Sequence, residues 1–378
     1  MILHIAKRGP HNIAAAVHIQ ALKDIYGEQN IFFVDLLPGS PKFNKNYVAY
    51  GKYKNIFERM HRWVEGNTSY ISNKIIFDIC RIIEERNIDM VFTEESDLGN
   101  LVKEIKRRDP RVKIICFYHD ISADLFTQRK KQAAFWKLHY KYIECPITIR
   151  QEKINQMFCD ENWVFHNTDA ERFYKYYKKK VDVMIPIASP VPIIDEKMRN
   201  VITKQDNEKK LLFVCSKYYV NIRGFMWFYR NVLLSLEGNF QIDVVGTGSF
   251  LLKNKCHDAR INFIGPVDQL SEYYLRADIV IVPIFDGGGM KVKVIEALSY
   301  AKCIVGTSES LHGVWEALPD NLKNCIVYNT DEAAVWIRVL NRLLYSDVNK
   351  FNYGLFQVFI EKFSYEAMLK QFKMHLIS

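Results

Sequence analysis

Short apolar runs of strand length alternate with helix-length segments along this chain, and this alternation limits its fold more than any other feature. In the first half, strand-like runs occupy 2–6, 31–36, 89–94, 112–118, 146–150 and 162–166, and helices are predicted over 13–26 and near 70–86. Thr168 and Glu171 have the spacing of a capping box, which predicts a helix start there. Because strands that are separated by helices pair in parallel, we expect an α/β fold with helices on both faces of a parallel sheet.

A proline-interrupted segment without a clear period, 184–197, follows this first series and is the predicted linker. Strand-like runs then restart at 210–216, 240–246, 261–265, 278–284, 303–307 and 324–329, and helices are predicted over 223–236, 290–301, 331–345 and 364–377. A length of 378 residues suits two domains. We predict an N-terminal domain over 1–188, a C-terminal domain over 205–355, and a helical segment over 356–378 that packs back towards the N-terminal domain.

The composition favours a globular cytoplasmic protein. Hydrophobic residues make up 49% of the chain, and no apolar run has the length of a membrane span. The first residues, MILHIAKRG, enter a strand-like pattern without a signal-like leader. The eight cysteines form no CxxC pair, which favours a reducing compartment and speaks against a zinc site or a disulfide framework.

Positive charge is concentrated in the first half. Residues 1–180 hold 30 Lys and Arg against 22 Asp and Glu, whereas residues 181–378 hold 22 and 21. This asymmetry predicts an acidic partner such as an anionic membrane, a phosphorylated acceptor or nucleic acid. The basic–aromatic segments 127–144 and 171–180 are candidate membrane-surface helices, with ordinary half-buried helices as the alternative. No RNA-binding motif accompanies them, so nucleic acid is not the expected partner.

The stretch PIFDGGGMKVKVIEALSYAKCIVGT, residues 283–307, carries the clearest chemical signal. Three glycines (287–289) follow a predicted buried strand and precede a helix, so backbone N–H groups and the positive helix end are predicted to bind an anion such as a phosphate. Lys291 and Lys293 add positive charge, and the carboxylate of Glu296 can accept hydrogen bonds from sugar hydroxyls. The pattern predicts a nucleotide or nucleotide-sugar site, although a tight turn alone also favours glycine.

Other polar and glycine residues stand where predicted strands end, which is where ligands of parallel sheets bind. Two rims that face one another would form a cleft. The second half contributes Ser216, Lys217, Arg223, Gly224, Gly246, Gly248, Gly265 and Val267, and the first half contributes Lys7, Gly9, Glu94, Glu95, Asp97, His119 and Asp120.

Four motifs in order resemble the GT-B-fold glycosyltransferases, specifically glycosyltransferase family 4 (group 1). They are LLFVCSKYYVNIRGFMWF (211–228), VVGTGS (244–249), FIGPVDQLSEYYLRADIVIVP (263–283) and GGGMKVKVIEALSYAKCIVGTSESLHGV (287–314). The first half is similar only in general plan and in the Tyr-His-Asp triplet at 118–120. The resemblance implies two Rossmann-like doubly wound domains that face a cleft, with the acceptor bound by the first and the donor by the second.

The resemblance also assigns roles by position. It implies that Gly246 and Gly248 lie against the donor diphosphate, that backbone near Val267 holds the base, and that Glu296 holds the ribose. It places His119 near the transferred sugar and Gly9 near the donor or acceptor. The implied catalytic residues are His119, Lys291 and Glu296. The donor set is Gly9, Ser216, Arg223, Gly246, Gly248, Val267, Asp286, Gly287, Gly288, Gly289, Lys291, Lys293 and Glu296, and the acceptor set is Glu94, Glu95, His119 and Asp120.

One departure concerns the Glu-x7-Glu signature of that family, because Gly288 occupies the position of its first Glu. This loss is typical of the branch with three glycines, and Asp286 is the candidate replacement. The resemblance further implies that the anomeric configuration is retained and that neither a metal nor a cofactor is required, since basic residues do the work of a cation.

The sequence therefore predicts a glycosyltransferase that moves a sugar from a UDP- or GDP-type donor to a glycan or lipid-linked acceptor. Bacterial surface polysaccharide synthesis, in the cytoplasm and peripherally on the inner membrane face, is the expected setting. Three alternatives stay open at this stage: a sugar-nucleotide epimerase, a donor-binding subunit without catalysis, and a nucleic-acid-binding protein that uses the positive first half.

Overall fold

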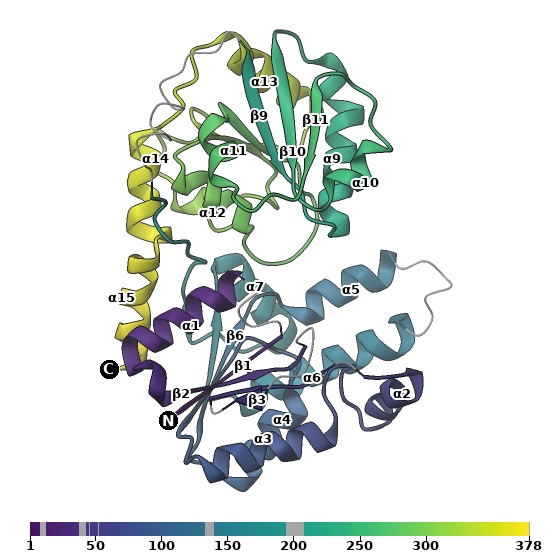
Figure 1. The fold of residues 1–378 in the computed structure, drawn as a ribbon, viewed down its shortest axis with the longest axis vertical. Coiled ribbons are helices and arrows are strands. Elements are labelled where there is room, and N and C mark those ends of the chain that lie inside the picture. Colours follow the sequence, from purple (N-terminus) through teal and green to yellow (C-terminus); the bar gives the residue numbers. More distant parts are fainter. Residues whose placement is uncertain are drawn as a thin grey trace. The chain divides into compact units, whose positions relative to one another are not determined.

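A computed structural model describes residues 1–7, 13–37, 43–44, 46–51, 53–132, 140–193 and 208–377 (Figure 1). The chain divides into two compact units, and each contains one sheet. The first unit comprises Met1–Pro186 together with Gln371–Ser378, and the second comprises Ile187–Lys370. The predicted fold class, an α/β protein with two Rossmann-like parallel sheets, is confirmed.

The sheet of the first unit has eight strands in the order β3-β4-β2-β1-β5-β6-β7-β8. All neighbours pair in parallel except β3 and β4, which are antiparallel. The strands are β1 (Ile2–Ala6), β2 (Ile31–Asp35), β3 (Phe43–Asn44), β4 (Tyr47–Ala49), β5 (Met90–Thr93), β6 (Lys113–Tyr118), β7 (Glu161–Val164) and β8 (Val183–Met184). The helices are α1 (Ile13–Tyr26), α2 (Ile56–Val64), α3 (Asn73–Glu85), α4 (Gly99–Arg108), α5 (Ser122–Gln132), α6 (Cys145–Phe158) and α7 (Asn167–Tyr177), with the short helical turns η2 (Glu28–Asn30) and η3 (Tyr140–Glu144).

Helices cover both faces of this sheet because its strands are apolar on both sides. On one face, α3 and α4 pack their buried side chains, such as Ile79 and Leu101, against the strands. On the other face, the buried rings of Phe92 and Trp163 contact the ring of Phe372, which lies near the end of the chain. The final residues of the last helix, α15 (Tyr365–Leu376), therefore belong to the first unit.

The sheet of the second unit is fully parallel and has six strands in the order β11-β10-β9-β12-β13-β14. Figure 1 shows α9 and α10 on one side of this sheet and α11 and α12 on the other. The strands are β9 (Lys209–Val214), β10 (Phe240–Val245), β11 (Ile261–Gly265), β12 (Ile279–Val282), β13 (Cys303–Gly306) and β14 (Val327–Asn329). The helices are α9 (Tyr219–Asn231), α10 (Ser249–Lys253), α11 (Ser271–Arg276), α12 (Val292–Ser299), α13 (Ala333–Tyr345) and α14 (Tyr353–Val358), with the turns η4 (Leu233–Ser235), η5 (Trp315–Ala317) and η6 (Phe359–Phe363).

Two predictions of local structure are wrong. The run 146–150 is not a strand, because it belongs to α6. Pro146 lies in the first turn of this helix, where a missing N–H is tolerated, and the β-branched residues after it imitate a strand. The cap of α7 is not Thr168 but His166, whose Nδ1 accepts a hydrogen bond from the backbone N–H of Thr168 at 3.1 Å.

All eight cysteines are free thiols, and seven of them are buried. Burial raises the pKa of the Cys215 thiol to about 11, so this group is a neutral part of the core. In the described part of the chain, none of the helices has the length and apolar character needed to cross a bilayer.

Candidate functional site

The glycine-rich turn joins the end of β12 to α12. Gly287 has a φ of +119° and Gly289 a φ of +59°, a backbone region that strains residues with a side chain. N–H groups at the start of a helix commonly lack partners within the helix, and α12 starts at Val292, soon after this turn. The local sequence therefore places a turn with unusual backbone angles beside the positive end of a helix dipole.

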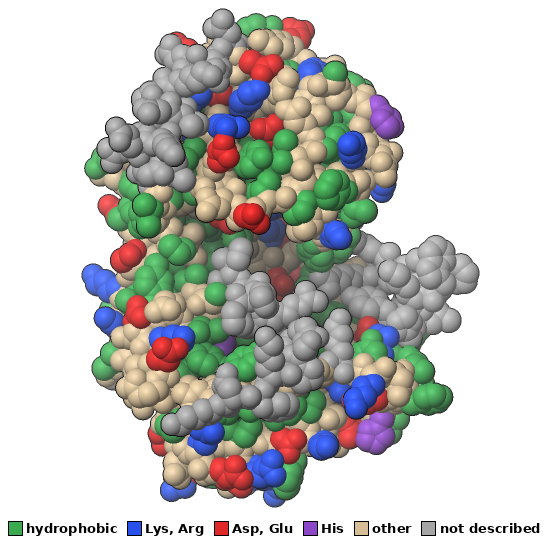
Figure 2. All heavy atoms as spheres, viewed as in Figure 1, with side chains coloured by type: hydrophobic (Ala, Val, Ile, Leu, Met, Phe, Trp, Pro, Cys, Tyr) green, Lys and Arg blue, Asp and Glu red, His purple; other side chains and the backbone are tan. Residues whose placement is uncertain are grey.

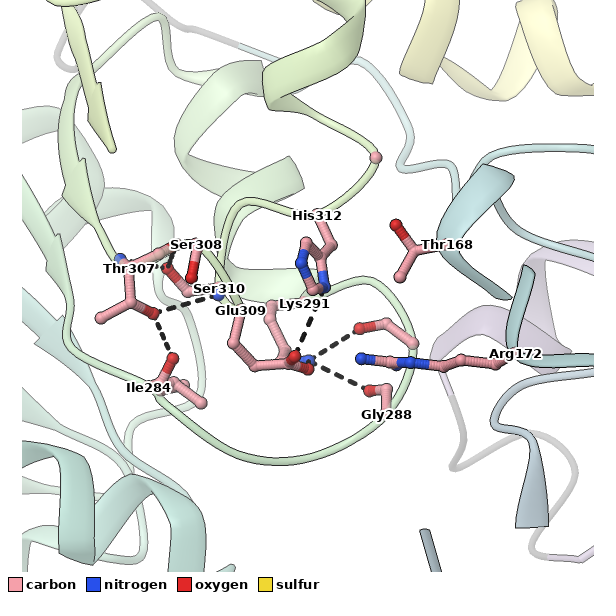
Figure 3. Close-up of polar contacts among 12 residues, drawn as sticks. Thr168, Arg172, Ile284, Gly288, Lys291, Thr307, Ser308, Glu309, Ser310 and His312 are labelled. Carbon is pink, nitrogen blue, oxygen red and sulfur yellow. Dashed lines mark hydrogen bonds and ion pairs between the residues drawn. The ribbon is translucent and has the colours of Figure 1, made fainter. Parts of the chain in front are cut away.

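Lys291 folds back over this turn (Figure 3). Its Nζ donates hydrogen bonds to the carbonyl oxygens of Gly288 at 3.1 Å and Gly289 at 2.7 Å, and it forms an ion pair with Glu309 at 3.1 Å. His312 lies 3.4 Å from the other carboxylate oxygen of Glu309. The ammonium group thus stabilises the turn and is held by a carboxylate from the loop after β13.

A buried hydrogen-bonded group fixes the start of that loop. The Thr307 hydroxyl donates to the carbonyl oxygen of Ile284 and accepts from the N–H of Ser310 at 3.1 Å (Figure 3). Because Ile284 lies just beyond β12 and Thr307 just beyond β13, the contact ties the two strand ends together. Glu309 is therefore carried by a rigid segment.

Lys293 is held by neutral acceptors. Its Nζ donates to the carbonyl oxygen of Val214 at 2.6 Å and to the side-chain oxygen of Asn221. Burial lowers the pKa of Lys293 to about 8, because the charged form is poorly solvated there. The ammonium group is thus placed at the end of β9, where a bound anion would stabilise its charge.

Glu296 projects from α12 one turn after Lys293. Its Oε2 accepts a hydrogen bond from the hydroxyl of Tyr274 at 2.9 Å, and the Tyr274 ring stacks on that of Tyr300 with centroids 5.2 Å apart. Burial raises the pKa of the Glu296 carboxyl. The stacked rings fix one carboxylate oxygen, which leaves the other oxygen for a further hydrogen bond.

Arg223 and Asp286, which are 63 positions apart in sequence, form an ion pair at 3.1 Å. The approach of their elements depends on Gly224, because a Cβ there would lie 1.9 Å from the carbonyl oxygen of Pro283. Ser216 is exposed, and its hydroxyl accepts from Asn221 Nδ2 at 2.8 Å. Asn221 therefore links Ser216 to Lys293.

The glycines of the second loop pack against the protein itself. The N–H of Gly246 donates to the carbonyl oxygen of Gly265 at 2.7 Å, and that of Gly248 donates to Cys215 at 2.8 Å. A Cβ at either position would lie within 2.5 Å of backbone or sulfur atoms of residues 215–216. These glycines are thus needed for close packing at the end of β9, whatever they contact in a complex. Val267 is half-buried on the following loop.

In the first unit, the buried carboxylate of Glu94 lies among three histidines. Its Oε1 is 2.9 Å from Nε2 of His4 and 3.1 Å from Nδ1 of His18, and its Oε2 is 3.0 Å from the same His18 nitrogen and 2.6 Å from Nε2 of His119. His4 and His18 are 1% exposed, whereas the His119 side chain is 21% exposed. His119 is thus the member of this cluster that solvent or a ligand reaches.

The protonation of the cluster follows from burial and from the carboxylate. Hydrogen bonds and charge interactions from the histidines hold the pKa of Glu94 well below its usual range despite burial. Burial lowers the pKa of His18. Burial also acts to lower the pKa of His119, but the Glu94 hydrogen bond and charge outweigh it, so the net shift is upwards. The cluster therefore favours a charged His119 beside an ionised Glu94.

Among the described residues, His18, Glu94 and His119 also form a group whose ligand atoms lie within 4.8 Å of one another, close enough for a metal ion. However, two ligands on one tetrahedral zinc ion stand about 3.3 Å apart. The 2.6 Å between His119 and Glu94 is the length of a charge-assisted hydrogen bond. The geometry favours a hydrogen-bonded cluster.

The carboxylates of Glu95 and Asp97, which follow Glu94 in the same loop, also have hydrogen-bond or ion-pair partners within the protein. Glu95 accepts from the N–H of Lys7 at 2.8 Å and from its Nζ at 2.7 Å. Asp97 contacts the same Nζ at 3.2 Å and accepts from the hydroxyl of Tyr70. Asp120 is half-buried beside His119, and the carboxylate that hydrogen-bonds the His119 ring is Glu94. Gly9 lies outside the described residues.

Several residues that complete these arrangements were not predicted: Asn221 and Glu309 beside the lysines, Tyr274 beside Glu296, and His4 and His18 around Glu94. Each comes from a different element than its partner, so sequence spacing carries no signal for the contact. His4 interrupts an apolar strand and His18 an apolar helix, and a polar residue at a core position is a signal that a buried partner exists.

Comparison with known proteins now adds to this geometry. Residues 208–346 match the model of the family described as Glycosyl transferases group 1. The match is confined to the second unit and covers less than half of the chain. Among curated proteins, no sequence matches this chain.

Solved structures extend the likeness of this glycosyltransferase fold to the whole chain. Sucrose-phosphate synthase from Thermosynechococcus elongatus has a TM-score of 0.72 at 13% identity, covering 100% of this chain and 98% of that one. Anabaena Alr3699/HepE in complex with UDP and glucose also has a TM-score of 0.72, at 11% identity with 100% and 99% coverage. The lipopolysaccharide outer core galactosyltransferase WaaB has 0.67 at 12% identity with 100% and 99% coverage. At these identities the likeness shows the GT-B-like fold.

Proposed function

We propose that this protein is a retaining glycosyltransferase that uses a nucleotide-diphosphate sugar as donor. The observation that carries the proposal is the gathering of Lys291, Lys293 and Arg223 at the strand ends of a group 1 glycosyltransferase domain, around a glycine-rich turn and a helix start. Anabaena Alr3699/HepE, whose fold is similar, has been solved in complex with UDP-glucose. A UDP- or GDP-type donor is the substrate that this site would take.

The proposed chemistry follows from charge. Breaking the bond between the anomeric carbon and the diphosphate leaves negative charge on the leaving phosphate, and positioned cations and N–H groups stabilise that charge. The acceptor hydroxyl attacks the anomeric carbon from the face that the diphosphate leaves, and its proton passes to the leaving phosphate oxygen. Lys293 donates its hydrogen bonds to neutral oxygens and interacts with Glu296 through charge alone, so the diphosphate would supply a close counter-charge.

Two further roles complete the donor site. Glu296, with one oxygen fixed by Tyr274, is proposed to accept hydrogen bonds from the ribose hydroxyls. Asp286 is proposed to take the place of the first Glu of the family signature, which is Gly288 here. Its ion pair with Arg223 supports this, because it holds the carboxylate beside a cation that is proposed to neutralise the diphosphate.

The acceptor side of the proposal rests on His119, which is proposed to contact the transferred sugar as a charged group held by Glu94. Because the Glu94 oxygens are occupied by three histidines, we assign Glu94 as a positioning residue and not as the group that binds acceptor hydroxyls. The proposed acceptor is a glycan or a lipid-linked sugar, and the proposed reaction needs no metal ion because lysines and arginine neutralise the diphosphate.

A donor panel tests the proposal. The full chain is incubated with UDP- and GDP-sugars in the presence of EDTA, and slow release of UDP or GDP is measured. We expect release with one donor class, and we expect Glu296→Ala to weaken binding of that donor in calorimetry while the circular dichroism spectrum stays unchanged. Absence of binding to every donor would contradict the proposal. An isomerised nucleotide sugar as the product would assign an epimerase instead.

A further inference from the structure

Helix α2 of the first unit is amphipathic, but its apolar side faces outwards. Ile56, Phe57, Met60 and Val64 are 52%, 77%, 50% and 87% exposed. At 3.6 residues per turn these four positions fall within about 100° of one another around the helix axis. They form one continuous strip, which we call the α2 apolar face.

The charged side of α2 faces inwards instead. Arg62 is 2% exposed, and its guanidinium donates to Glu58 at 2.7 Å and to the carbonyl oxygen of Ser69 at 2.9 Å. The Arg59 side chain is 18% exposed and pairs with Glu144 at the start of α6. An amphipathic helix is normally stabilised by burying its apolar side in the core, and α2 buries its arginines instead. The inverted orientation indicates that the α2 apolar face serves a partner.

The charges around this face indicate what that partner is. The three nearby carboxylates are engaged: Glu58 with Arg62, Glu144 with Arg59, and Glu65, which accepts from the N–H of Asn73 at 2.9 Å. Among the described residues, the exposed basic side chains at its border are Lys54 and Arg150, the latter beside Gly66 just after the end of α2. His61 is also exposed and lies 3.4 Å from Glu65. The border is therefore cationic.

Aromatic and apolar residues continue the surface on the neighbouring element. Tyr142 is 62% exposed and Ile143 is 37% exposed, and both precede Glu144, the partner of Arg59. Figure 2 shows hydrophobic side chains at the surface in the region where α2 lies in Figure 1, next to histidine, lysine or arginine side chains.

We propose that the α2 apolar face docks on an anionic membrane surface, with its apolar side chains among the lipid headgroups and acyl chains and Lys54 and Arg150 at the headgroup phosphates. A second copy of this chain is a poorer occupant, because residues 1–180 carry an excess of positive charge and two such surfaces would repel one another. This inference goes beyond the proposed transferase, since it concerns a surface of the first unit and needs no donor.

The segments that the sequence predicted for membrane contact fit less well. In 171–180, Phe173 is fully buried, Tyr176 donates to Asp124 at 3.0 Å, and Tyr177 donates to Glu152, while Tyr174 is 51% exposed. In 127–144, residues 133–139 lie outside the described residues. On α2, in contrast, four exposed apolar side chains lie together on one side of a single helix.

Vesicle flotation tests the proposal with the full chain and without any nucleotide sugar. Phosphatidylcholine vesicles with phosphatidylglycerol are expected to carry the wild type upwards, and added salt is expected to weaken the effect. Phe57→Ser is expected to lower the partition coefficient about tenfold, because a large ring is no longer removed from water. Lys54→Glu is expected to lower it at least about fivefold.

A matched control uses Met157→Ser, which removes an exposed apolar side chain (63%) at the far end of α6 and is expected to change nothing. Wild-type protein that stays unbound with phosphatidylglycerol would overturn the proposal, as would a Phe57→Ser variant that floats like the wild type. A Phe57→Ser change that alters the sedimentation coefficient of the lipid-free protein would assign the face to a second copy. Donor hydrolysis is measured separately, so either proposal can fail alone.

Discussion

Two lysines that stand two positions apart have opposite electrostatic surroundings. Lys291 is paired with Glu309, whereas Lys293 is buried against the neutral oxygens of Val214 and Asn221. A pKa of about 8 for Lys293, compared with 10.5 for the free side chain, means that the charged form costs on the order of 3 kcal/mol in the empty site. Binding of a diphosphate at the proposed donor site would offset this cost, so we expect the buried lysine to favour anionic ligands there.

The first prediction concerns the pH dependence of UDP binding. Lys293 is charged below its pKa of about 8 and neutral above it, so UDP affinity is expected to fall as the pH rises through 8, by about fivefold over the next unit. Calorimetry across this range measures the effect. Lys293→Arg keeps its charge over this range, so its UDP affinity is expected to be independent of pH. Lys291→Arg is expected to show the same decrease in UDP affinity above pH 8 as the wild type. A wild-type affinity that is constant from neutral to alkaline pH would refute the assignment.

The second prediction concerns Glu94. Its negative charge and hydrogen bond raise the pKa of His119 against the effect of burial, so Glu94→Gln is expected to lower that pKa, which NMR of the imidazole C–H groups measures. Glu95→Gln is the comparison, because Glu95 acts on His119 through charge alone and hydrogen-bonds Lys7, so a smaller decrease of the His119 pKa is expected. An unchanged His119 titration in Glu94→Gln would show that burial, and not the carboxylate, sets its charge.

The same residue gives the third prediction, on stability. The folded-state pKa of Glu94 is depressed, so its contribution to stability is present above the unfolded-state pKa near 4.5 and is lost as the pH falls through the folded-state value. At neutral pH, Glu94→Ala is expected to lower the free energy of unfolding by about 3–5 kcal/mol. Urea unfolding at neutral and acidic pH measures the difference, which is expected to shrink in acid. An equal loss of unfolding free energy at neutral and acidic pH would mean that Glu94 stabilises the fold through packing and not through its charge.

Residue-scale contacts mark the limit of what the sequence reveals. The glycine turn, both lysines and Glu296 were predicted because they lie within ten positions on one strand-turn-helix unit. Glu94 and His119 were also singled out, but their contact was not, because it depends on β5 and β6 being neighbours in the sheet. The environment of a charged group is set by elements that are distant in sequence.

At the scale of elements, the longer strands were predicted because their apolar runs are bounded by turn residues, whereas the two- and three-residue strands β3, β4 and β8 were missed. The run 146–150 failed because β-branched residues occur in both element types, and a helix-starting proline resembles a strand break. The orientation of α2 was not predicted either. Periodicity tells that a helix has an apolar side, but not whether that side faces the core.

The fourth prediction tests the packing of α9 on β12. Gly224→Ala would place a Cβ 1.9 Å from the carbonyl oxygen of Pro283, so backbone must shift, and we expect a loss of about 1–3 kcal/mol of unfolding free energy. Gly354→Ala is the matched control in the same unit, because its Cβ would meet no atom closer than 3.4 Å and alanine favours helix. Urea unfolding compares both variants. Equal stability of the two would mean that α9 is free to move away from β12.

At the scale of the whole molecule, the chain returns to the first unit at its end. α15 begins in the second unit, and Gln371–Ser378 belong to the first, so one helix is shared between the two. The ring of Phe372 is fully buried, and its centroid lies 5.2 Å from that of the His18 ring and 5.5 Å from that of the Trp163 ring. The hydroxyl of Tyr26 donates a hydrogen bond to the carbonyl oxygen of Leu376 at 2.9 Å. The core of the first unit is therefore completed by residues from the second half of α15.

The fifth prediction follows from this return. Phe372→Ala removes a buried ring from the first unit, and a loss of about 3–5 kcal/mol is expected there. Hydrogen exchange resolved by mass spectrometry measures this loss of stability. We expect faster exchange in β1, β5 and β7 of the first unit and unchanged exchange in β9 and β12 of the second. Met374→Ala, on the same helix but 61% exposed, is expected to exchange like the wild type. Added UDP is expected to slow exchange in α12 of both variants alike, since the proposed donor site lies in the second unit. Faster exchange in β9 and β12 of Phe372→Ala would instead mean that the two units unfold as one.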